Sequence, residues 1–418
     1  MNTKSGNTVT AAEFPTATEV KSVDNPSSAK LLESVKKSPP SVLILVQTAT
    51  DWHRRIVEGV ASYVSEQGPW YVHIEPRGLY EKLSIPKGWR GDGIIARFDH
   101  KALADQVKAL GVPAVNVSWS QATTVDIPCV FADEYASGRL AAEHFLDNAF
   151  RNFGYVGPID RPDYHEDRLL EAFRERLAES GYMSTTYHPP EKKTPLGWHD
   201  QIVHLTAWLD RQPKPLAVFT WSDARSRELV EACWEGGYKV PEDVAIISSE
   251  QEANMSLFAG IELSSVNLAP QRVGYEAAAT LDQMMQGKPV ASMHKRIPAL
   301  GVTVRQSSDY VAVEDPFVSE ALGVIRERYQ DPITVEDLLQ ICRLSRRTLE
   351  KHFKAELGRT PADELRRVRL ERAKQLLRDT DLTVEEISTR CGFLYANTLT
   401  RNLREQIGLT PTAFRNMK

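Results

Sequence analysis

Cysteine is scarce in this sequence, and long apolar runs are missing. Four cysteines occur among 418 residues, and neighbouring ones lie at least 49 positions apart. Because no CxxC pair exists, the spacing argues against a zinc cluster or a disulfide framework and favours small buried side chains. No apolar run approaches the roughly 18 residues that a membrane helix needs, so we expect no membrane partner.

Sequence motifs that mark common enzymes are also missing. The chain has no GxxxxGK[ST] phosphate loop, no HExxH metal motif and no GxSxG nucleophile elbow. Residues 91–96, GDGIIA, imitate a nucleotide fingerprint but lead into a predicted strand, which is typical of a turn. His53, His199 and His204 do not pair at metal-ligand spacing. We therefore predict a protein that is not an enzyme and has no cofactor or metal.

The amino-terminal segment has no apolar core of the kind found in signal peptides. Residues 1–40 are rich in Thr, Ser, Lys and Pro. We interpret them as a disordered tail, and we expect the protein to remain in the cytoplasm.

Charge is divided unevenly along the chain. The formal net charge of −5 is by itself unfavourable for binding nucleic acid. From Phe317 onward, however, 19 Lys and Arg residues stand against 15 Asp and Glu residues, a net charge of +4 that leaves −9 for the preceding part. The opposite signs predict one part that meets phosphates and one part that does not.

Residues 41–305 alternate between short apolar runs and amphipathic stretches. This alternation indicates parallel sheets covered by helices, and about 265 residues exceed one sheet of usual size, so we predict an α/β domain of two lobes. The expected strands are 42–46, 71–75, 93–96, 114–117, 155–157, 216–220 and 244–248, and the expected helices are 54–66, 101–110, 137–148, 168–180 and 224–236.

The alternation ends at a polar stretch. We interpret residues 306–316, QSSDYVAVEDP, as a linker, because only helical patterns follow it. The predicted organisation is a tail over 1–40, a two-lobed α/β domain over 41–305, a linker over 306–316 and an all-α domain over 317–418.

The all-α segment contains an internal repeat. Residues 334–338, TVEDL, recur 49 positions later as TVEEI, and after one inserted residue the offset becomes 50. The matches at the larger offset are Thr348-Leu349 with Thr398-Leu399, Phe353 with Leu403, and the GxTP segments at 358–361 and 408–411. We therefore expect two copies of one helical unit.

Each copy has the pattern of a helix-turn-helix. Thr334 and Thr383 can cap a first helix whose first turn is acidic, which suits the helix dipole. A second helix starts near Ser345 in the first copy, and Leu349 must face inward, so polar side chains suited to base edges project from its other side. The predicted DNA-binding residues are Ser345, Arg346, Arg347, Glu350, Lys351, Asn397, Thr398, Thr400 and Arg401.

One helix over residues 362–378 is expected to join the copies. Its 17 residues span roughly 25 Å at 1.5 Å per residue. This length can hold the two recognition helices about one DNA turn, roughly 34 Å, apart. The alternative is an all-helical interaction module with a solvated charged face, which the duplicated GxTP endings disfavour.

The helical segment resembles the AraC/XylS family of transcription regulators, whose signature is two such units joined by a helix. The resemblance rests on SRRTLEKHFKAELGRTP, RVRLERAKQLL and the run from EEISTRCGF to TPTAFR, about a hundred residues in all. It implies that the family's DNA-contacting positions correspond here to Arg347, Glu350, Lys351, Asn397, Thr398 and Arg401.

The preceding half resembles LacI-type regulators and periplasmic sugar-binding proteins. The similar stretches are FADEYASGRLAAEHF, PEDVAIISSEQE and SSVNLAPQRVGYEAAATLDQMMQGKPV. With the helical end, the arrangement is similar to that of xylose-operon regulators over nearly the whole chain after residue 40. The resemblance implies that this half binds a small sugar between two lobes and transmits their closure to the DNA-binding end.

Polar residues at the ends of predicted strands are the candidates for sugar contact. A pocket in an α/β fold forms at the carboxyl ends of parallel strands, and a sugar needs carboxylates, amides, Arg and an aromatic face. For each residue, a surface ion pair or a helix cap is an equally good explanation. By resemblance, Arg168 matches a ligand-binding Arg, whereas Glu250-Gln251 departs from the usual Asp-Asn. The candidates are Asp51, Trp52, Arg54, Asp99, Asp133, Glu134, Arg168, Asp223, Glu250 and Gln251.

The predicted function is that of a sugar-responsive, sequence-specific DNA-binding regulator of xylose-like catabolic genes. The expected partners are double-stranded promoter or operator DNA, a small sugar such as a pentose, RNA polymerase, and a second copy of the chain in a homodimer. One alternative is a purely ligand-binding receptor, against which the missing signal peptide counts. Another is a sugar-transforming enzyme, for which no base–nucleophile pair is visible.

Overall fold

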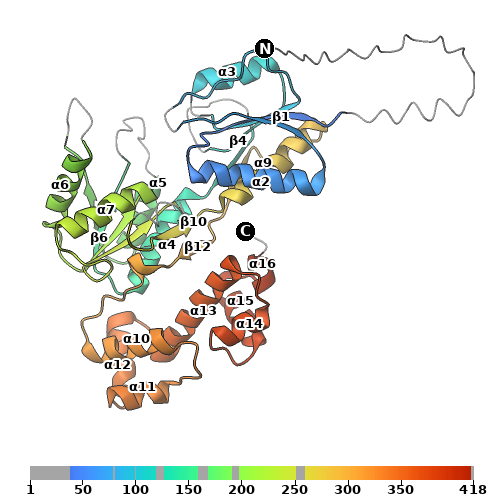
Figure 1. The fold of residues 1–418 in the computed structure, drawn as a ribbon. Coiled ribbons are helices and arrows are strands. Elements are labelled where there is room, and N and C mark those ends of the chain that lie inside the picture. Colours follow the sequence, from blue (N-terminus) through green and yellow to red (C-terminus); the bar gives the residue numbers. More distant parts are fainter. Residues whose placement is uncertain are drawn as a thin grey trace, which may run out of the picture. The chain divides into compact units, whose positions relative to one another are not determined.

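The computed structural model describes residues 38–78, 81–98, 100–118, 127–158, 168–190, 197–250 and 259–415. In these ranges the chain forms two β-sheets with helices packed on them, and then only helices (Figure 1). Two of the predicted sugar-contact residues, Asp99 and Gln251, and most of the predicted tail lie outside the described residues.

The first sheet is parallel throughout. It contains β1 (Ser41–Leu45), β2 (Tyr71–Ile74), β3 (Gly93–Ala96), β4 (Ala114–Asn116), β5 (Cys129–Ala132) and β11 (His294–Ile297). The strand order is β11-β5-β4-β3-β1-β2. The central strands β1 and β3 are the apolar runs SVLIL and GIIA and are almost wholly buried, because a parallel strand with helices on both faces has no polar side.

The second sheet repeats this plan, with one antiparallel strand at its edge. It contains β6 (Asn152–Val156), β7 (Ser184–Tyr187), β8 (Leu216–Thr220), β9 (Val244–Ser248), β10 (Ser264–Asn267) and β12 (Gly301–Thr303). The order is β12-β10-β9-β8-β6-β7, and β12 runs antiparallel to β10. Each sheet therefore has one edge at which the carboxyl ends of its parallel strands meet.

Helices cover the faces of the two sheets. They are α2 (Asp51–Gln67), α3 (Lys101–Leu110), α4 (Glu134–Asp147), α5 (Arg168–Ala178), α6 (Trp198–Leu209), α7 (Asp223–Glu235) and α9 (Pro270–Met285). Figure 1 shows α2 and α9 side by side on the first sheet. A Cβ on Gly274 of α9 would lie 1.9 Å from the backbone oxygen of Ile56 in α2, so only glycine permits this close approach of the two backbones.

In the described part of the chain, the backbone passes between the sheets at three places. It leaves the first sheet after β5, returns after β10, and crosses again between β11 and β12. The hydrophobic cores show on which sheet each helix packs: α9 packs on the first sheet, whereas α4 packs on the second. We call residues 298–300, between β11 and β12, the third crossing segment.

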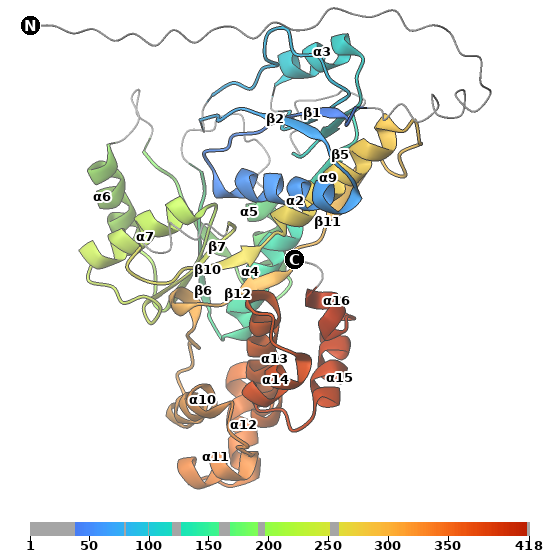
Figure 2. The ribbon, with the colours of Figure 1, turned by 45° about the vertical axis from the view of Figure 1, so that its right-hand side comes forward.

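The helical end of the chain has two separate cores. The elements after β12 are the 3₁₀ turn η1 (Gln306–Ser308), α10 (Pro316–Arg328), α11 (Val335–Cys342), α12 (Arg346–Leu357), α13 (Pro361–Asp379), α14 (Val384–Arg390), α15 (Ala396–Ile407) and α16 (Pro411–Arg415). Residues of α10, α11 and α12 form one core and residues of α14, α15 and α16 the other. Helix α13 contributes to both cores and extends from one group of helices to the other (Figure 2).

The described structure agrees with most of the expected elements and corrects some of them. The helix expected from residue 54 begins at Asp51, because the hydroxyl of Thr50 caps it. The strand expected over 71–75 is present as β2 but is exposed, because it lies at the edge of its sheet. In the segment 306–316, which we expected to be the linker, Ser307 and Val311 are buried.

Three of the four cysteines, Cys233, Cys342 and Cys391, are buried, as predicted, and Cys129 is half-buried. All four are free. No helix of the described ranges is both long and apolar enough to cross a membrane.

Candidate functional sites

The first helix-turn-helix unit consists of α11 and α12. Between the helices, Arg343 adopts the left-handed conformation with φ 51° and ends α11. The Ser345 hydroxyl then caps α12 by accepting a hydrogen bond from the amide of Thr348 at 3.2 Å. Leu349 and Phe353 are fully buried, so the opposite side of α12 faces solvent.

Predicted DNA-binding residues lie on this outer side of α12. Arg347 and Lys351 are exposed. Arg346 is exposed as well, but its guanidinium is held by the carboxylates of Glu336 at 3.1 Å and Glu350 at 3.0 Å. Arg347 and Lys351 are therefore better placed than Arg346 to reach a ligand.

The second unit, α14 and α15, has the same construction. The hydroxyl of Thr383 accepts a hydrogen bond from the amide of Glu386 at 3.2 Å, and the Glu386 carboxylate accepts one from the amide of Thr383 at 2.7 Å. This capping box satisfies donors that the first turn of α14 would otherwise leave open. Leu399 is fully buried in the core of this unit.

The outer side of α15 carries the remaining predicted DNA-binding residues. Asn397 and Arg401 are exposed, and Thr398 and Thr400 are half-buried. The two recognition helices α12 and α15 are joined by α13, whose 19 residues correspond to roughly 28 Å.

On the first sheet, the predicted sugar-contact residues follow β1 and β5. Asp51, Trp52 and Arg54 form the first turn of α2, directly beyond β1. Arg54 donates hydrogen bonds to the backbone oxygen of Ala49 at 2.9 Å and to the Asp51 carboxylate at 3.3 Å. Part of the guanidinium of Arg54 thus holds the loop after β1, as expected for a structural role.

Asp133 and Glu134 begin α4 beyond β5. The Asp133 carboxylate caps the helix by accepting from the amide of Ala136 at 3.0 Å, and it lies 3.8 Å from the guanidinium of Arg296. This is the capping alternative that the sequence left open, although a cap can still face a ligand with its other oxygen.

The second sheet places the other candidates at the corresponding edge. Arg168 begins α5 after β6, Asp223 begins α7 after β8 and is buried, and Glu250 follows β9. The amide of Glu250 donates to the hydroxyl of Ser248 at 3.1 Å. The candidates therefore form two groups, one at the carboxyl edge of each sheet.

Sequence reasoning missed three polar residues at these edges, of which Gln47 and Asn116 are buried and Arg97 is half-buried. Gln47 follows β1, Arg97 follows β3, and Asn116 ends β4. The Asn116 side-chain oxygen accepts from the amides of Phe98 at 3.2 Å and Ser118 at 3.0 Å. The only available signal for Gln47 and Asn116 was their place at the end of an apolar run, because amide side chains carry no charge or motif that marks them.

Arg225 is a second kind of residue that sequence reasoning missed. It lies in the first turn of α7, is buried, and donates from Nε to the backbone oxygen of Gly157 at 3.1 Å. Burial lowers the pKa of the Arg225 guanidinium, although its partner Glu228 acts in the opposite direction. Arg225 thus adds a buried cation at the carboxyl ends of β6 and β8.

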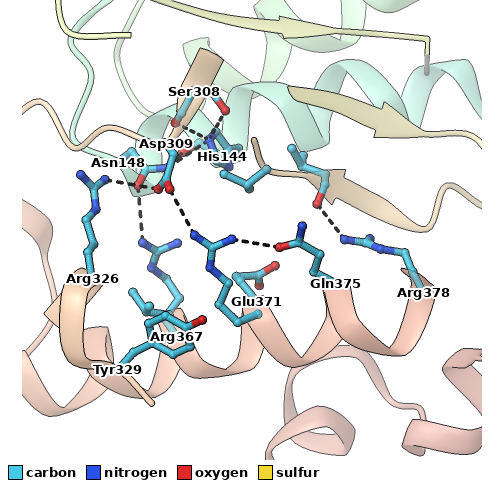
Figure 3. Close-up of a pocket in the computed structure, with 14 residues that line it drawn as sticks. His144, Asn148, Ser308, Asp309, Arg326, Tyr329, Arg367, Glu371, Gln375 and Arg378 are labelled. Carbon is cyan, nitrogen blue, oxygen red and sulfur yellow. Dashed lines mark hydrogen bonds and ion pairs between the residues drawn. The ribbon is translucent and has the colours of Figure 1, made fainter. Parts of the chain in front are cut away.

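A cavity lies where α13 meets the second sheet, and arginines line it (Figure 3). The Arg378 guanidinium donates to the backbone oxygens of Leu300 and Val302, both at 3.3 Å. Leu300 belongs to the third crossing segment, so the last turn of α13 is bonded to a connection between the two sheets. Arg378 is only 8% exposed.

Two more arginines of α13 face the second sheet in the same cavity. Arg372 contacts the Asp309 carboxylate at 3.3 Å, and Arg326 of α10 lies 3.8 Å from the same carboxylate. Arg367 donates to the side-chain oxygen of Asn148 at 3.4 Å. These contacts hold α13 against residues that follow α4 and η1 (Figure 3).

No metal centre is found among the described residues, since no group of three or more His, Cys, Asp and Glu side chains there is arranged to hold an ion.

Three family models match successive parts of the chain. Residues 41–135 match the XylR N-terminal domain, residues 142–308 a periplasmic binding protein-like domain, and residues 338–417 a helix-turn-helix domain. The xylose operon regulatory protein of Escherichia coli K12 is 29% identical over 383 residues, which cover 90% of this chain and 97% of that protein. The protein of the same name from Haemophilus influenzae is 27% identical with the same coverage.

A solved structure extends this likeness to three dimensions. The structure described as the xylose-binding transcription activator XylR is 28% identical, covers 91% of this chain and 99% of its own, and gives a TM-score of 0.58. The chain is a transcription regulator that combines a periplasmic-binding-protein-like sensor domain with a helix-turn-helix domain, and it is similar to xylose operon regulators over most of its length. A ribose-bound LacI family regulator from Enterococcus faecium, 18% identical over 65% of this chain with a TM-score of 0.52, shows the fold of the sensor alone.

These findings decide several of the sequence predictions. The two-lobed α/β fold followed by a double helix-turn-helix is confirmed. The prediction of a transcription regulator and not an enzyme is confirmed by the relatives, which are regulators. The residue assignments within the sensor and the recognition helices stay predictions.

One half-buried histidine of the sensor lines the cavity at α13. His144 of α4 contacts the hydroxyl of Ser308 and the side-chain amide of Asn148, both at 3.2 Å (Figure 3). Burial, and then the charge of Arg367, lower the pKa of His144 to about 4, against the opposing effect of Glu371 and Asp309. His144 is therefore neutral in the folded protein near pH 7.

We predict that His144 makes the folded state less stable as the pH falls from about 6.5 to 4. An unfolded histidine has a pKa of about 6.5, so in this window the unfolded chain binds one proton more than the folded chain, and stability rises with pH. The full effect is on the order of 3 kcal/mol. Urea unfolding of wild type and His144→Gln at several pH values measures it, and the variant should have the flatter dependence.

The matched control is His199→Gln, which removes an exposed imidazole and should keep the wild-type pH dependence. Equal slopes for wild type and His144→Gln would contradict the prediction, because they would mean that His144 is protonated as readily in the folded protein as in the unfolded chain.

Proposed function

We propose that this regulator controls genes of carbohydrate catabolism in response to a small sugar such as a pentose. The sugar binds between the carboxyl edges of the two sheets and changes how α12 and α15 meet promoter DNA. The observation that carries the proposal is the contact of Arg378 with Leu300 and Val302. It links a segment that a closing ligand would move to the helix that spaces the two recognition helices.

The choice of a pentose is supported by the relatives. Those from Escherichia coli and Haemophilus influenzae are named xylose operon regulatory proteins, and the solved relative is described as xylose-binding. The two edges offer the groups that a sugar requires, namely carboxylates such as Asp51 and Glu250 and the half-buried ring of Trp52. Asp99 and Gln251 remain candidates from the sequence.

The domains and partners form part of the proposal. Residues 41–305 are the effector domain and residues 317–418 the DNA-binding domain, joined by residues 306–316. A homodimer is supported by β2, an edge strand with Tyr71, Val72 and Ile74 exposed, because natural proteins usually cover such an edge. The regulator works in the cytoplasm and contacts RNA polymerase at the promoters that it controls.

The proposal is tested by the mobility of promoter DNA with the full-length protein and a panel of pentoses and hexoses. We expect one pentose to change the DNA affinity by about 5- to 150-fold, the usual range of allosteric coupling. Glu250→Ala should weaken that sugar by about 1–3 kcal/mol, because buried polar partners lose their bond, and should leave the DNA affinity without sugar unchanged.

The control for this experiment is Glu235→Ala, an exposed carboxylate at the far end of α7, which should change neither affinity. DNA binding that no sugar affects would reject sugar control, and absence of any sequence-selective binding would reject the regulator function at these helices.

We further predict that Arg347 and Arg401 each determine the preference for a different base pair. An Arg that binds guanine with two hydrogen bonds contributes about 1–3 kcal/mol of discrimination at one position, whereas an Arg on phosphate weakens all sequences alike. Selection of binding sites from random DNA by wild type, Arg347→Ala and Arg401→Ala measures this. The affected positions should lie about ten base pairs apart, one DNA turn.

Lys354→Ala serves as the control for base selection. Lys354 is exposed in the last turn of α12, and its replacement should weaken DNA binding without changing the preferred sequence. If the two Arg variants bind more weakly but select the wild-type sequence, the base-contacting role is wrong. Affected positions only two or three base pairs apart would contradict the two-groove arrangement.

Arg378 is predicted to transmit the sugar signal. Arg378→Met keeps the apolar stem but removes the donors to Leu300 and Val302, so movement of the third crossing segment no longer reaches α13. We expect the sugar to change the DNA affinity of this variant by less than about twofold, well below the usual range of allosteric coupling. The affinity for the sugar itself should stay within about a factor of three, a difference of under 1 kcal/mol. The DNA affinity is measured by titration with labelled DNA, and the sugar affinity by calorimetric titration of the protein with sugar in the absence of DNA.

The control for Arg378 is Arg366→Met, on the same helix. Arg366 is exposed and pairs locally with Asp363 at 3.4 Å. This variant should keep the full sugar effect. An unchanged sugar effect in Arg378→Met would place the coupling in other contacts between the sensor and the helices.

A further inference from the structure

The turn of the second helix-turn-helix unit contains one residue that the first turn lacks. In the first turn, Arg343 in the left-handed conformation is followed by Leu344 and then by the cap Ser345. In the second turn, Gly392, also left-handed, is followed by Phe393, then by Leu394, and only then by the cap Tyr395. Leu394 is the inserted residue that changes the offset of the repeat from 49 to 50.

The inserted residue is apolar and exposed. Leu394 is 81% exposed and Tyr395 is 71% exposed. Leu344 packs on the core of the first unit and Phe393 is buried in the core of the second, so the core position of each turn is already filled. Leu394 therefore adds no packing to the fold, and a polar residue would serve the turn equally well.

The position of Tyr395 is likewise unusual for its residue type. The equivalent Ser345 caps its helix through its hydroxyl, whereas Tyr395 makes no side-chain cap. Serine is strongly preferred over large side chains at this position. The second unit thus gives up a capping bond and exposes two large apolar surfaces side by side at the start of α15.

The surroundings of the pair are basic. Between Ile387 and Arg404 there is no acidic residue, whereas Arg390, Arg401 and Arg404 are exposed. In a helix-turn-helix, the amino-terminal residues of the recognition helix contact base edges in the major groove. The charge and the position both favour DNA as the partner that covers Leu394 and Tyr395.

We propose, resting on the proposed function, that Leu394 and Tyr395 recognise thymines in the half-site bound by α15, through apolar contact with the 5-methyl group. Thymine is the only base that presents a methyl group in the major groove. Contact with Leu394 removes the apolar surfaces of both partners from water. The second unit thereby recognises a feature of DNA that α12, with Arg347, Glu350 and Lys351 on its outer side, does not address.

The test uses full-length protein and the site selected from random DNA. Each thymine of the half-site is replaced in turn by deoxyuridine, which keeps the base pair and removes only the methyl group. For wild type, we expect the replacement at one or two positions to weaken binding about fourfold, the effect of burying one methyl-sized group. Leu394→Ser should bind the thymine and uracil sites equally at one of these positions.

Tyr395→Ser provides a second variant that should preserve folding, because it places at the start of α15 the same capping residue, serine, that Ser345 supplies to α12. It should lose the distinction between thymine and uracil at the same or the neighbouring position. The control is Arg404→Ala, on the same helix, which should weaken the thymine and uracil sites by the same factor and retain the fourfold ratio.

The outcomes separate this inference from the proposed function. Sequence-selective binding by wild type with equal affinity for every thymine and uracil site overturns the inference alone. The inference is also overturned if both variants keep the wild-type ratio of affinities for the thymine and uracil sites. If these variants in addition fail to activate transcription with purified RNA polymerase, Leu394 and Tyr395 contact that protein instead of DNA. Loss of sequence-selective binding by wild type itself overturns the proposed function and the inference with it.

Discussion

Charged groups buried along α13 have to be paired, and this requirement determines how α13 packs at its junction with the sensor domain. Glu364 is 1% exposed and lies between the guanidinium groups of Arg359 at 2.5 Å and Arg367 at 2.8 Å. Burial acts to raise the pKa of Glu364, but its bonds to Arg367 and Arg359 lower it overall. Because an unpaired buried charge is strongly destabilising, α13 fits its surroundings in very few positions.

The same requirement connects the recognition helices to the sensor. Arg359 donates to the backbone oxygen of Asp147 at 2.5 Å, and Arg367 and Arg378 also reach residues of the sensor. Arg372 reaches Asp309, in the segment that joins the two domains. Apolar contact accompanies the charges, since Ala149 of the sensor and Val311 belong to the core of the first helix-turn-helix unit. A change at the junction is therefore passed to a rigid helix that both units share.

The two units share a plan but have different outer surfaces. In the first, Arg346 is engaged by Glu336 and Glu350, and the exposed groups are polar. In the second, Asn397 and Arg401 stand beside Leu394 and Tyr395. Duplication fixed the positions of Leu349 and Leu399 in the cores, because a core tolerates little change in volume, and left the outer positions free to differ.

By itself, the sequence determined the features that depend on local periodicity and on matched spacing. The apolar run SVLIL and the amphipathic stretch after it predicted β1 and α2, and the duplicated TVE and GxTP segments predicted both helix-turn-helix units with their caps at Thr334 and Thr383. It missed short polar strands such as β7, STTY, because their stability comes from neighbouring strands and not from their own pattern.

Only the tertiary structure decided which distant polar groups meet. Arg378 and Leu300 are 78 positions apart, and nothing in the segment RAKQLLRD distinguishes an arginine that binds a backbone oxygen from one that faces water. The sequence likewise placed Asp133 and Arg54 at strand ends without showing that one caps α4 and the other holds the loop after β1. Such contacts depend on how the helices and sheets pack, which local periodicity does not encode.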